Sequence, residues 1–462
     1  MERTITAQNR ELLWKAMRRN GMEIAMPCGG TGKCGKCTVI LDGEKVRSCS
    51  TYIEGTHTVV CQDGDAGVIL ADAPCEIEAS GNKKGLGAAV DLGTTTLVVS
   101  VYDLETGALI KTESCWNCLK TYGADVISRI DYIKNNGALS ELSLKIRTQV
   151  ADITAPLGVR RICVAGNTVM QHIFAGIDPS SIAVSPFEPK TLFEGCTDEL
   201  EGAQVLYSPC VAGYVGGDIT AGILASGIAG KEGRYLYIDV GTNGEMALGG
   251  KDGFLCCSCA CGPAFEGAQI SCGMPGLEGA VSHVKPDGDR LAVETIADAK
   301  PAGICGSGLV DLAAALLARG DMDGTGRLYP GEVEIADGIG ITQSDIRQLQ
   351  LAKAAVRAGI AVLMKESGTE FEDIDSLVLC GGFGTFLDTD SACAIDMLPK
   401  ELSGRTVSCG NTSLRGAALA LLDDGGFEKA LEIKNKCKYL ELSGNGNFDD
   451  EYIEHMTFGE DI

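Results

Sequence analysis

The sequence predicts an α/β protein of two unequal parts: a small, cysteine-rich α+β module, then a large α/β domain of two duplicated lobes. Three observations predict this arrangement. Charge is uneven, because residues 1–60 carry nine Lys and Arg against six Asp and Glu, whereas the remaining 402 carry 30 against 57. Four cysteines gather within the first 50 residues. A strand-and-turn motif that begins at residue 87 recurs 148 residues later.

Composition excludes several classes of protein. With 462 residues and a net charge of −24, the chain can bury several cores and is a poor partner for nucleic acid or an anionic membrane. Its opening residues, MERTITAQ, lack the basic-then-apolar order of a signal peptide, and no apolar run reaches the roughly 18 residues of a membrane span. We therefore expect a cytoplasmic protein, in which the 21 cysteines stay reduced or bind metal.

We expect the N-terminal module to span residues 1–79 and a linker to span residues 80–86, because segments 62–67 and 80–87 are rich in turn residues. Within the module, residues 3–7 predict a short strand. Asn9 predicts the cap of a helix whose apolar face contains Leu13 and Met17. Asp42-Gly43 predicts a two-residue hairpin turn.

The four cysteines follow the spacing Cys28-x5-Cys34-x2-Cys37-x11-Cys49. Four thiolates spaced in this way suit zinc or an iron–sulfur cluster, and purely structural thiols remain an alternative. The residues between them are mostly Gly, Thr and Lys, so that backbone N–H groups can approach sulfur closely. This composition favours the cluster.

Residues 22–60 resemble ferredoxin-like [2Fe–2S] domains, and the stretch CGKCTVILDGEKVRSC is similar to the small iron–sulfur domains of molybdenum hydroxylases. The resemblance implies a β-grasp-like fold whose four cysteines hold a [2Fe–2S] cluster. Such domains usually begin with a further strand, for which this chain starts too late. We expect the domain to be trimmed or its sheet edge to be covered by another segment.

Two phosphate-binding signatures mark the large domain, GAAVDLGTTT and YLYIDVGTNG. Each is an apolar strand that ends in an aspartate, Asp91 or Asp239, which can hold Mg²⁺ directly or through water. Backbone N–H groups and hydroxyls of the turns that follow can bind phosphate oxygens. These turn residues are Gly93, Thr94, Thr95, Gly241, Thr242 and Asn243. A third strand runs into the glycine-rich turn of Gly381, Gly382, Phe383 and Gly384.

This arrangement resembles the nucleotide-binding fold of actin, sugar kinases and heat-shock chaperones. The resemblance implies a duplicated, ribonuclease-H-like domain over residues 87–462. Its first lobe would comprise residues 87–228 plus the C-terminal segment, and its second lobe residues 229–410. Two hairpins would clamp the ATP phosphates and the third turn would hold the adenosine.

Two helices that cross between the lobes are expected at residues 215–228 and 411–422, which are rich in small side chains. Asp218 begins the first of these helices. It either positions a water molecule or Mg²⁺ at the γ-phosphate or only caps its helix.

Finer motifs narrow the family: YGADVISRI, AGNTVMQH, CGPAFEGA, GICGSGLVD and CGGFG together resemble the reductive activators of corrinoid proteins. The resemblance implies ATP-dependent reduction of Co(II) to Co(I) on the corrinoid protein of a methyltransferase system. The electron would pass from an external low-potential donor through the [2Fe–2S] cluster. It also implies Mg²⁺ and places Gly306 and Ser307 in the nucleotide site. Larger members carry an extra domain that the short linker excludes here, and a homodimer is left open.

Other readings remain open at this stage. The same fold serves ATP-driven electron donors to dehydratases or reductases, small-molecule kinases and redox sensors. Glu266 is a candidate cleft carboxylate or only a cap or surface residue, and Asn167 and Thr168 are candidates for lining the cleft. His172 and the cysteines of the CCSCAC stretch are expected to be packing residues. Residues 443–450 are expected to form a surface loop.

Overall fold

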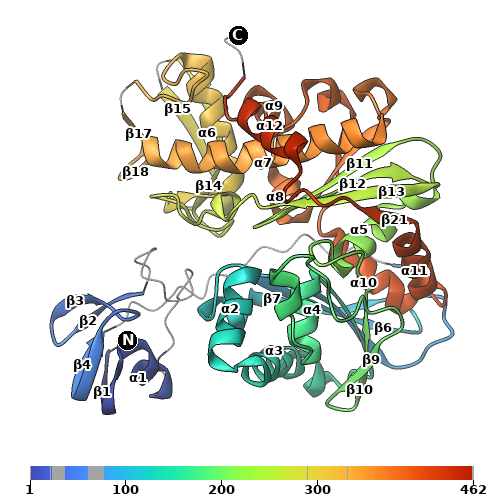
Figure 1. Cartoon of the computed structure of the whole chain (residues 1–462), viewed down its shortest axis with the longest axis horizontal. Helices are drawn as coiled ribbons and strands as arrows, with labels where there is room; N and C mark the ends of the chain where they lie inside the picture. Colours follow the sequence, from blue (N-terminus) through green and yellow to red (C-terminus); the bar gives the residue numbers. More distant parts are fainter. Residues whose placement is uncertain are drawn as a thin grey trace.

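The computed structural model describes residues 2–20, 22, 37–60, 77–288, 290–329 and 331–459. Cys28, Cys34 and the turn-rich segment 62–67 lie outside these residues. In Figure 1 the described part forms a small N-terminal unit beside two larger lobes, with helices where the lobes meet. The α/β fold class is confirmed, while the predicted limits of the module and the linker stay predictions.

The N-terminal unit is a sheet with the strand order β1-β4-β2-β3, on which one helix packs. Its elements are β1 (Glu2–Leu12), α1 (Leu13–Arg19), β2 (Thr38–Leu41), β3 (Glu44–Arg47) and β4 (Tyr52–Val60). Leu13 and Met17 of α1 are buried against Ile5, Val39 and Val59 of the sheet.

The predicted strand and hairpin of this unit are confirmed, but the predicted start of its helix is wrong. Asn9 lies in β1, which continues to Leu12 and pairs antiparallel with β4. The helix begins only after Leu12, which makes no side-chain cap. Pairing with β4 gives the backbone of the last β1 residues hydrogen-bond partners that a helix start would have left to water. Asp42 and Gly43 turn between β2 and β3 with φ angles of 50° and 92°.

The two large sheets repeat one topology, which confirms the predicted duplication. In each, consecutive antiparallel strands are followed by a strand parallel to the first and then by another parallel strand. The first sheet has the order β7-β6-β5-β8-β10-β9 and consists of β5 (Leu86–Leu92), β6 (Thr96–Asp103), β7 (Leu109–Trp116), β8 (Arg161–Gly166), β9 (Thr197–Leu200) and β10 (Ala203–Tyr207). The second has the order β20-β19-β11-β12-β13-β21 and consists of β11 (Tyr235–Val240), β12 (Gly244–Gly250), β13 (Gly253–Cys259), β19 (Ser376–Cys380), β20 (Thr406–Ser408) and β21 (Cys437–Tyr439).

Helices cover both faces of each sheet (Figure 1). The helices of the two lobes are α2 (Val126–Asn136), α3 (Leu139–Thr154), α4 (Thr168–Ala175), α5 (Gly217–Ser226), α6 (Gly306–Arg319), α7 (Gln343–Ser367), α8 (Gly381–Phe386), α9 (Thr389–Ala394), α10 (Thr412–Leu422), α11 (Gly426–Lys436) and α12 (Gly446–Glu454). In β5, Ala88 and Val90 face the core that contains α2, α3 and α4, whereas Ala89 between them packs with α10 on the opposite face. This alternation follows from the two-residue period of a strand.

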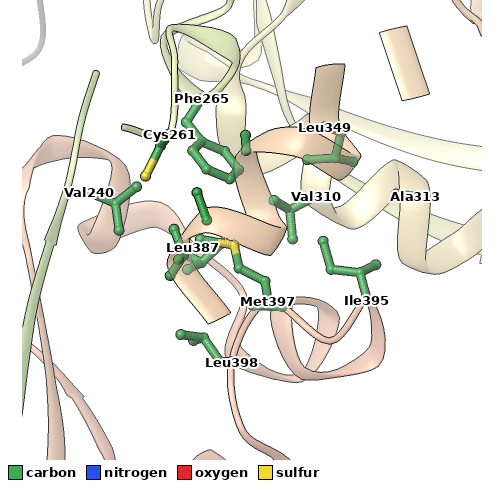
Figure 2. Packing of buried hydrophobic residues seen from close by; sticks show 14 of the residues in the cluster. Val240, Cys261, Phe265, Val310, Ala313, Leu349, Leu387, Ile395, Met397 and Leu398 are labelled. Carbon is green, nitrogen blue, oxygen red and sulfur yellow. The ribbon is translucent and has the colours of Figure 1, made fainter. Parts of the chain in front are cut away.

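Smaller elements complete the second lobe and the connections. The strands are β14 (Ala280–Asp287), β15 (Arg290–Thr295), β16 (Gly303–Ile304), β17 (Glu332–Ala336) and β18 (Ile339–Thr342). The 3₁₀ turns are η1 (Cys118–Thr121), η2 (Ala155–Leu157), η3 (Ser180–Ala183), η4 (Ile228–Gly230), η5 (Ala264–Glu266), η6 (Ile296–Asp298), η7 (Phe371–Asp373) and η8 (Lys400–Arg405). Figure 2 shows part of the second lobe's core, where Phe265 of η5, Val310 of α6 and Met397 come together.

Both predicted crossing helices are confirmed as α5 and α10, and they touch because small residues line their contact. A Cβ added to Gly416 of α10 would lie 2.0 Å from the carbonyl oxygen of Ala221 in α5. A Cβ on Gly222 would lie 1.9 Å from the hydroxyl of Tyr237 in the second sheet. The lobes therefore meet through two closely packed helices.

The C-terminal segment divides between the lobes instead of belonging to the first alone. Helix α10 packs on β5 and β8, whereas β21 pairs with β13 and α12 packs on α7 of the second lobe. Residues 446–454 form α12, so the prediction of a surface loop over residues 443–450 is wrong for its second half. Asn445 caps this helix with its side chain, which the run of Gly and Asn in the sequence concealed.

Candidate functional site

A cavity of about 310 Å³ lies between the lobes and is lined by the turns that follow β5, β11 and β19. Nearly all residues predicted for the nucleotide site line this cavity: Asp91, Gly93, Thr94, Thr95, Asp218, Asp239, Gly241, Thr242, Asn243, Gly306, Ser307, Gly381, Gly382 and Phe383. Gly384 is the exception, because it is buried within α8 behind the cavity. Residues 322 positions apart in the chain meet here, as the hydrogen bond between Ser413 and Asp91 illustrates.

The first hairpin, residues 93–95 between β5 and β6, is held from behind by side chains of neighbouring elements. Asn117 donates to the Gly93 carbonyl at 2.7 Å, and Arg129 donates to the Thr94 carbonyl at 2.5 Å. Asn167 donates to the Thr94 hydroxyl at 2.9 Å. These bonds fix the shape of the turn.

The second hairpin, residues 241–243 between β11 and β12, lies against the start of α8. Gly381 has a φ of +77°, and a Cβ there would lie 2.3 Å from the carboxylate of Asp239. Only glycine satisfies both conditions. The expected glycine-rich turn is in fact the first turn of the short helix α8.

Four carboxyl groups line the cavity between the lobes: Glu245, which is buried, and Asp91, Asp218 and Asp239, which are half-buried. Burial, with repulsion from Asp239 and Asp91, raises the pKa of Asp218 to about 7. Burial and the charge of Asp91 raise the pKa of Asp239 to about 7. Burial also raises the pKa of Asp91 and of Glu245. Such a concentration of negative charge suits a cation.

Asp91 differs from the other three carboxyl groups because its two oxygens are occupied. Asn411 and Ser413, at the start of α10, donate to them at 2.8 and 2.9 Å. Asp218 lies in the first turn of α5, where Gly216 and not Asp218 is the N-cap residue. Its carboxylate accepts from the backbone N–H of Ile219 at 2.9 Å and lines the cavity.

Among the described residues, no three His, Cys, Asp or Glu side chains are arranged to hold a metal ion by themselves. The carboxyl groups that line the cavity fit Mg²⁺ bound together with a nucleotide, because Mg²⁺ is usually held by one or two carboxylates together with phosphates and water.

Glu266 of η5 connects the two hairpins. The Thr95 hydroxyl donates to one of its carboxylate oxygens at 2.8 Å, and the Thr242 hydroxyl donates to the other at 2.9 Å. Burial raises the pKa of Glu266, while these two hydrogen bonds act in the opposite direction. Glu266 is therefore a cleft residue.

The remaining cavity wall combines aromatic and small residues. Phe383 packs against Phe265 with ring centroids 4.7 Å apart. A Cβ on Gly306 would lie 2.1 Å from the carbonyl oxygen of Phe265, so α6 can begin this close only with glycine. Ser307 is buried and its hydroxyl donates to the Ser282 carbonyl at 2.9 Å.

Two of the four predicted cluster cysteines are described, and the structure brings them together. Cys37 and Cys49 are 1% and 6% exposed and pack in one small group with Trp14 of α1. The backbone N–H of Ser48 donates to the Cys37 carbonyl at 3.0 Å, which ties the two segments. Two buried thiols on joined segments fit an iron–sulfur group, whereas Cys28 and Cys34 lie outside the described residues.

Other candidates have packing roles. His172 is fully buried, with one ring nitrogen 2.7 Å from the Thr168 carbonyl, and burial lowers its pKa. In the CCSCAC stretch, strand alternation sends Cys256 into one core cluster and Cys257 and Cys259 into another. Asn167 lines the cavity, as predicted, whereas Thr168 donates its hydroxyl to the Ala212 carbonyl instead.

Sequence reasoning missed Glu245, Asn411, Ser413 and Arg129. Glu245 faces Asp239 across the β11–β12 ladder, so its place could have been found by counting the hairpin register. Asn411 and Ser413 stand at the start of a helix that was predicted, and the NTS run is a recognisable cap. Nothing in the sequence signals that Arg129, which is fully buried, supports the first hairpin.

Comparisons with known proteins agree with this geometry. A family model described as the RACo middle region matches residues 86–231, and one described as the C-terminal domain of RACo, the ASKHA domain, matches residues 234–461. A third, described as a 2Fe-2S iron-sulfur cluster binding domain, matches residues 1–63.

Individual relatives match most of the chain. Corrinoid activation enzyme RamQ of Eubacterium limosum is 32% identical over 423 residues, which cover 81% of this chain and 71% of that protein. A [Co(II) methylated amine-specific corrinoid protein] reductase of Methanosarcina barkeri is 26% identical over 417 residues, covering 80% of this chain and 77% of that protein. The solved structure of a reductive activator for corrinoid,iron-sulfur protein matches with a TM-score of 0.74 and 30% identity, covering 99% of this chain and 78% of that chain.

Proposed function

Because the chain belongs to the family of reductive activators of corrinoid proteins, we propose that it uses ATP to return the inactive Co(II) form of a corrinoid protein to Co(I). The partner would be the corrinoid protein of a methyltransferase system, and an external low-potential donor would supply the electron. The observation that carries the proposal is the cavity in which two duplicated hairpins meet, in the same chain as an iron–sulfur domain.

We assign the nucleotide site to the residues that line this cavity. The hairpin residues Gly93, Thr94, Thr95, Gly241, Thr242 and Asn243 would bind the β- and γ-phosphates. Asp91 and Asp239 would hold Mg²⁺, and Asp218 would position the attacking water. Gly381, Gly382, Phe383, Gly306 and Ser307 would surround the adenosine, and Gly384 would support them from within α8.

The charge of the cavity is consistent with this assignment. Its carboxyl groups repel one another when ionised, which is one reason for the raised pKa values of Asp218 and Asp239. A bound divalent cation would relieve that repulsion and favour the ionised forms.

In the N-terminal module, Cys28, Cys34, Cys37 and Cys49 would hold a [2Fe–2S] cluster, which supplies one-electron transfer when bound. The role of the chain itself is to shield and place this site. Trp14 packs over the two described cysteines, and Leu13, Ala16 and Met17 of α1 are buried in the module's core.

Reducing a low-potential cobalt centre is uphill, so ATP has to contribute free energy. Nucleotide can shift the redox step only if the nucleotide-bound lobes bind the corrinoid partner differently from the empty lobes. The two hairpins belong to different lobes, so a nucleotide that contacts both would change how the lobes are held. Hydrolysis would then reset them.

The direct test mixes the reduced protein with a Co(II) corrinoid protein, with and without MgATP, and follows Co(I) by absorption spectroscopy. We expect Co(I) to form only with MgATP. Asp239→Ala should abolish this ATP-dependent reduction, by at least about 100-fold, because it removes a metal-binding carboxylate. The variant's iron–sulfur spectrum should match that of the wild type, since the cysteines lie in the other module. Unchanged reduction by Asp239→Ala would contradict the coupling.

A further inference from the structure

We propose that Glu266 acts as a stand-in for the nucleotide's phosphates: its carboxylate ties the two hairpins together in the nucleotide-free protein, and ATP must displace it to bind. The inference rests on the proposed function, because it concerns the same cavity. It adds a residue that competes with the nucleotide instead of binding it.

The two hydroxyl groups that hydrogen-bond to Glu266 belong to the hairpins that would bind the phosphates. Thr95 and Thr242 carry one of the proposed phosphate-binding hydroxyls in each hairpin, and both donate to Glu266, at 2.8 and 2.9 Å. A threonine hydroxyl has a single hydrogen to donate. While it donates to the carboxylate it cannot donate to a phosphate oxygen, so the two acceptors exclude each other.

The carboxylate of Glu266 lies close to the backbone of the second hairpin. A Cβ built on Gly241 would lie 3.6 Å from a Glu266 oxygen, which places that oxygen against the backbone of the second hairpin. The side chain is half-buried and lines the cavity. Burial raises the pKa of Glu266, while its hydrogen bonds to the two threonines and the guanidinium of Arg129 favour the ionised form. The Glu266 carboxyl group thus occupies the space between the hairpins that phosphates would enter.

The residues on either side of Glu266 are closely packed. Its neighbour Phe265 is buried in the second lobe's core beside Val310 (Figure 2) and packs on Phe383. Gly267 has a φ of +74°, and a Cβ there would lie 2.3 Å from the Met274 carbonyl oxygen. The backbone is therefore fixed, and the side chain has to rotate away when phosphates enter.

The consequence is a lower apparent affinity for nucleotide. If only the untied fraction of the protein accepts phosphates, the apparent Kd is the intrinsic Kd divided by that fraction. Removing the tie should therefore strengthen nucleotide binding, which is the opposite of what removing a ligand-binding residue does.

The test measures MgATP affinity of the full-length protein by isothermal titration calorimetry. Two hydrogen bonds to a carboxylate justify an expected gain of about tenfold or more for Glu266→Ala. Glu266→Gln keeps one acceptor oxygen and loses the charge, so it should bind about threefold tighter or better. Glu278→Ala, which removes an exposed carboxylate of the segment between η5 and β14, should bind like the wild type.

A second measurement tests whether Glu266 holds the two hairpins together in the absence of nucleotide. Amide hydrogen exchange of residues 92–96 and 240–244 should be faster in nucleotide-free Glu266→Ala than in the wild type, and should converge when MgATP is added. If the alanine variant does not fold, the glutamine variant decides through both measurements.

The outcomes separate the two proposals. A wild type that binds MgATP while both Glu266 variants bind it equally or more weakly overturns the stand-in role. A wild type that binds no MgATP contradicts the proposed function. The exchange comparison then still decides whether Glu266 holds the hairpins together, and unchanged exchange would overturn the tie.

Discussion

At the scale of single residues, the carboxyl groups of the cavity repel one another when ionised, and a bound cation would reduce this repulsion. Asp218 and Asp239 would both be ionised in water at neutral pH, yet burial and repulsion from neighbouring carboxylates raise each pKa to about 7. Asp91 offsets part of its own burial by accepting from Asn411 and Ser413. In the nucleotide-free protein, ionising Asp218 and Asp239 therefore lowers the stability of the folded state.

This cost predicts a pH dependence of stability. A carboxyl group whose pKa rises from 3.8 to about 7 on folding binds more protons folded than unfolded between these values. Its contribution to stability is present at low pH and is lost as the pH rises from about 4 through about 7. We therefore expect the melting temperature of the metal- and nucleotide-free protein to fall between pH 5 and pH 8, as measured by circular dichroism.

Asp218→Asn removes one of these groups while keeping its shape. The variant should melt at least about 2–4 °C above the wild type at pH 8 and show a shallower fall with pH. Asp131→Asn, which changes an exposed aspartate of α2, should follow the wild-type curve. A parallel shift of the Asp218→Asn curve at every pH would mean that repulsion is not the cause.

At the scale of elements, the lobes depend on how closely α5 and α10 approach. Both helices also position the site: α5 carries Asp218, and the start of α10 holds Asp91. Their separation at Gly416 leaves no room for a side chain. A change in the packing of this pair would therefore move carboxyl groups of the cavity.

Gly416→Ala tests this contact. The added methyl group would lie 2.0 Å from the Ala221 carbonyl oxygen, so the helices must separate, and we expect a loss of about 1–3 kcal/mol in the free energy of unfolding by urea. Gly446→Ala is the matched control, because its Cβ would meet nothing within 4 Å. Equal stability of the two variants would show that the helix pair tolerates separation.

The elements also show what the sequence could and could not predict. Both hairpins and both crossing helices were predictable, because apolar runs, turn residues and caps are local signals. The start of α1 was not, since pairing of β1 with β4 overrides the capping tendency of Asn9. The place of Glu245 follows from the hairpin register, which sequence reasoning did not count. Glu266 was a candidate for the cleft, but its hydrogen bonds to both hairpins depend on two lobes meeting. Local pattern predicts elements, whereas contacts between distant segments complete the site.

At the scale of the whole molecule, Arg18 joins the N-terminal module to the first lobe. Its guanidinium donates to the Tyr132 hydroxyl at 3.1 Å and to the Thr121 carbonyl at 3.3 Å. It also lies 4.0 Å from the centroid of the Tyr122 ring and 5.1 Å from that of Trp14. Trp14 packs on Cys37 and Cys49, so the contact that joins the two parts lies beside the predicted cluster ligands.

Arg18→Ala should loosen this junction, because cation–π contacts and hydrogen bonds of this kind contribute about 1–3 kcal/mol together. We expect a larger radius of gyration in small-angle X-ray scattering and faster proteolysis between the two parts, with MgATP affinity unchanged because the cavity lies in the large domain. Arg19→Ala is the matched control, since Arg19 pairs with Glu11 inside the module. If both variants scatter like the wild type, Arg18 does not hold the module in place. If only Arg18→Ala expands, the contact made by Arg18 positions the module against the first lobe, beside the surface that a corrinoid partner would approach to reach the cluster.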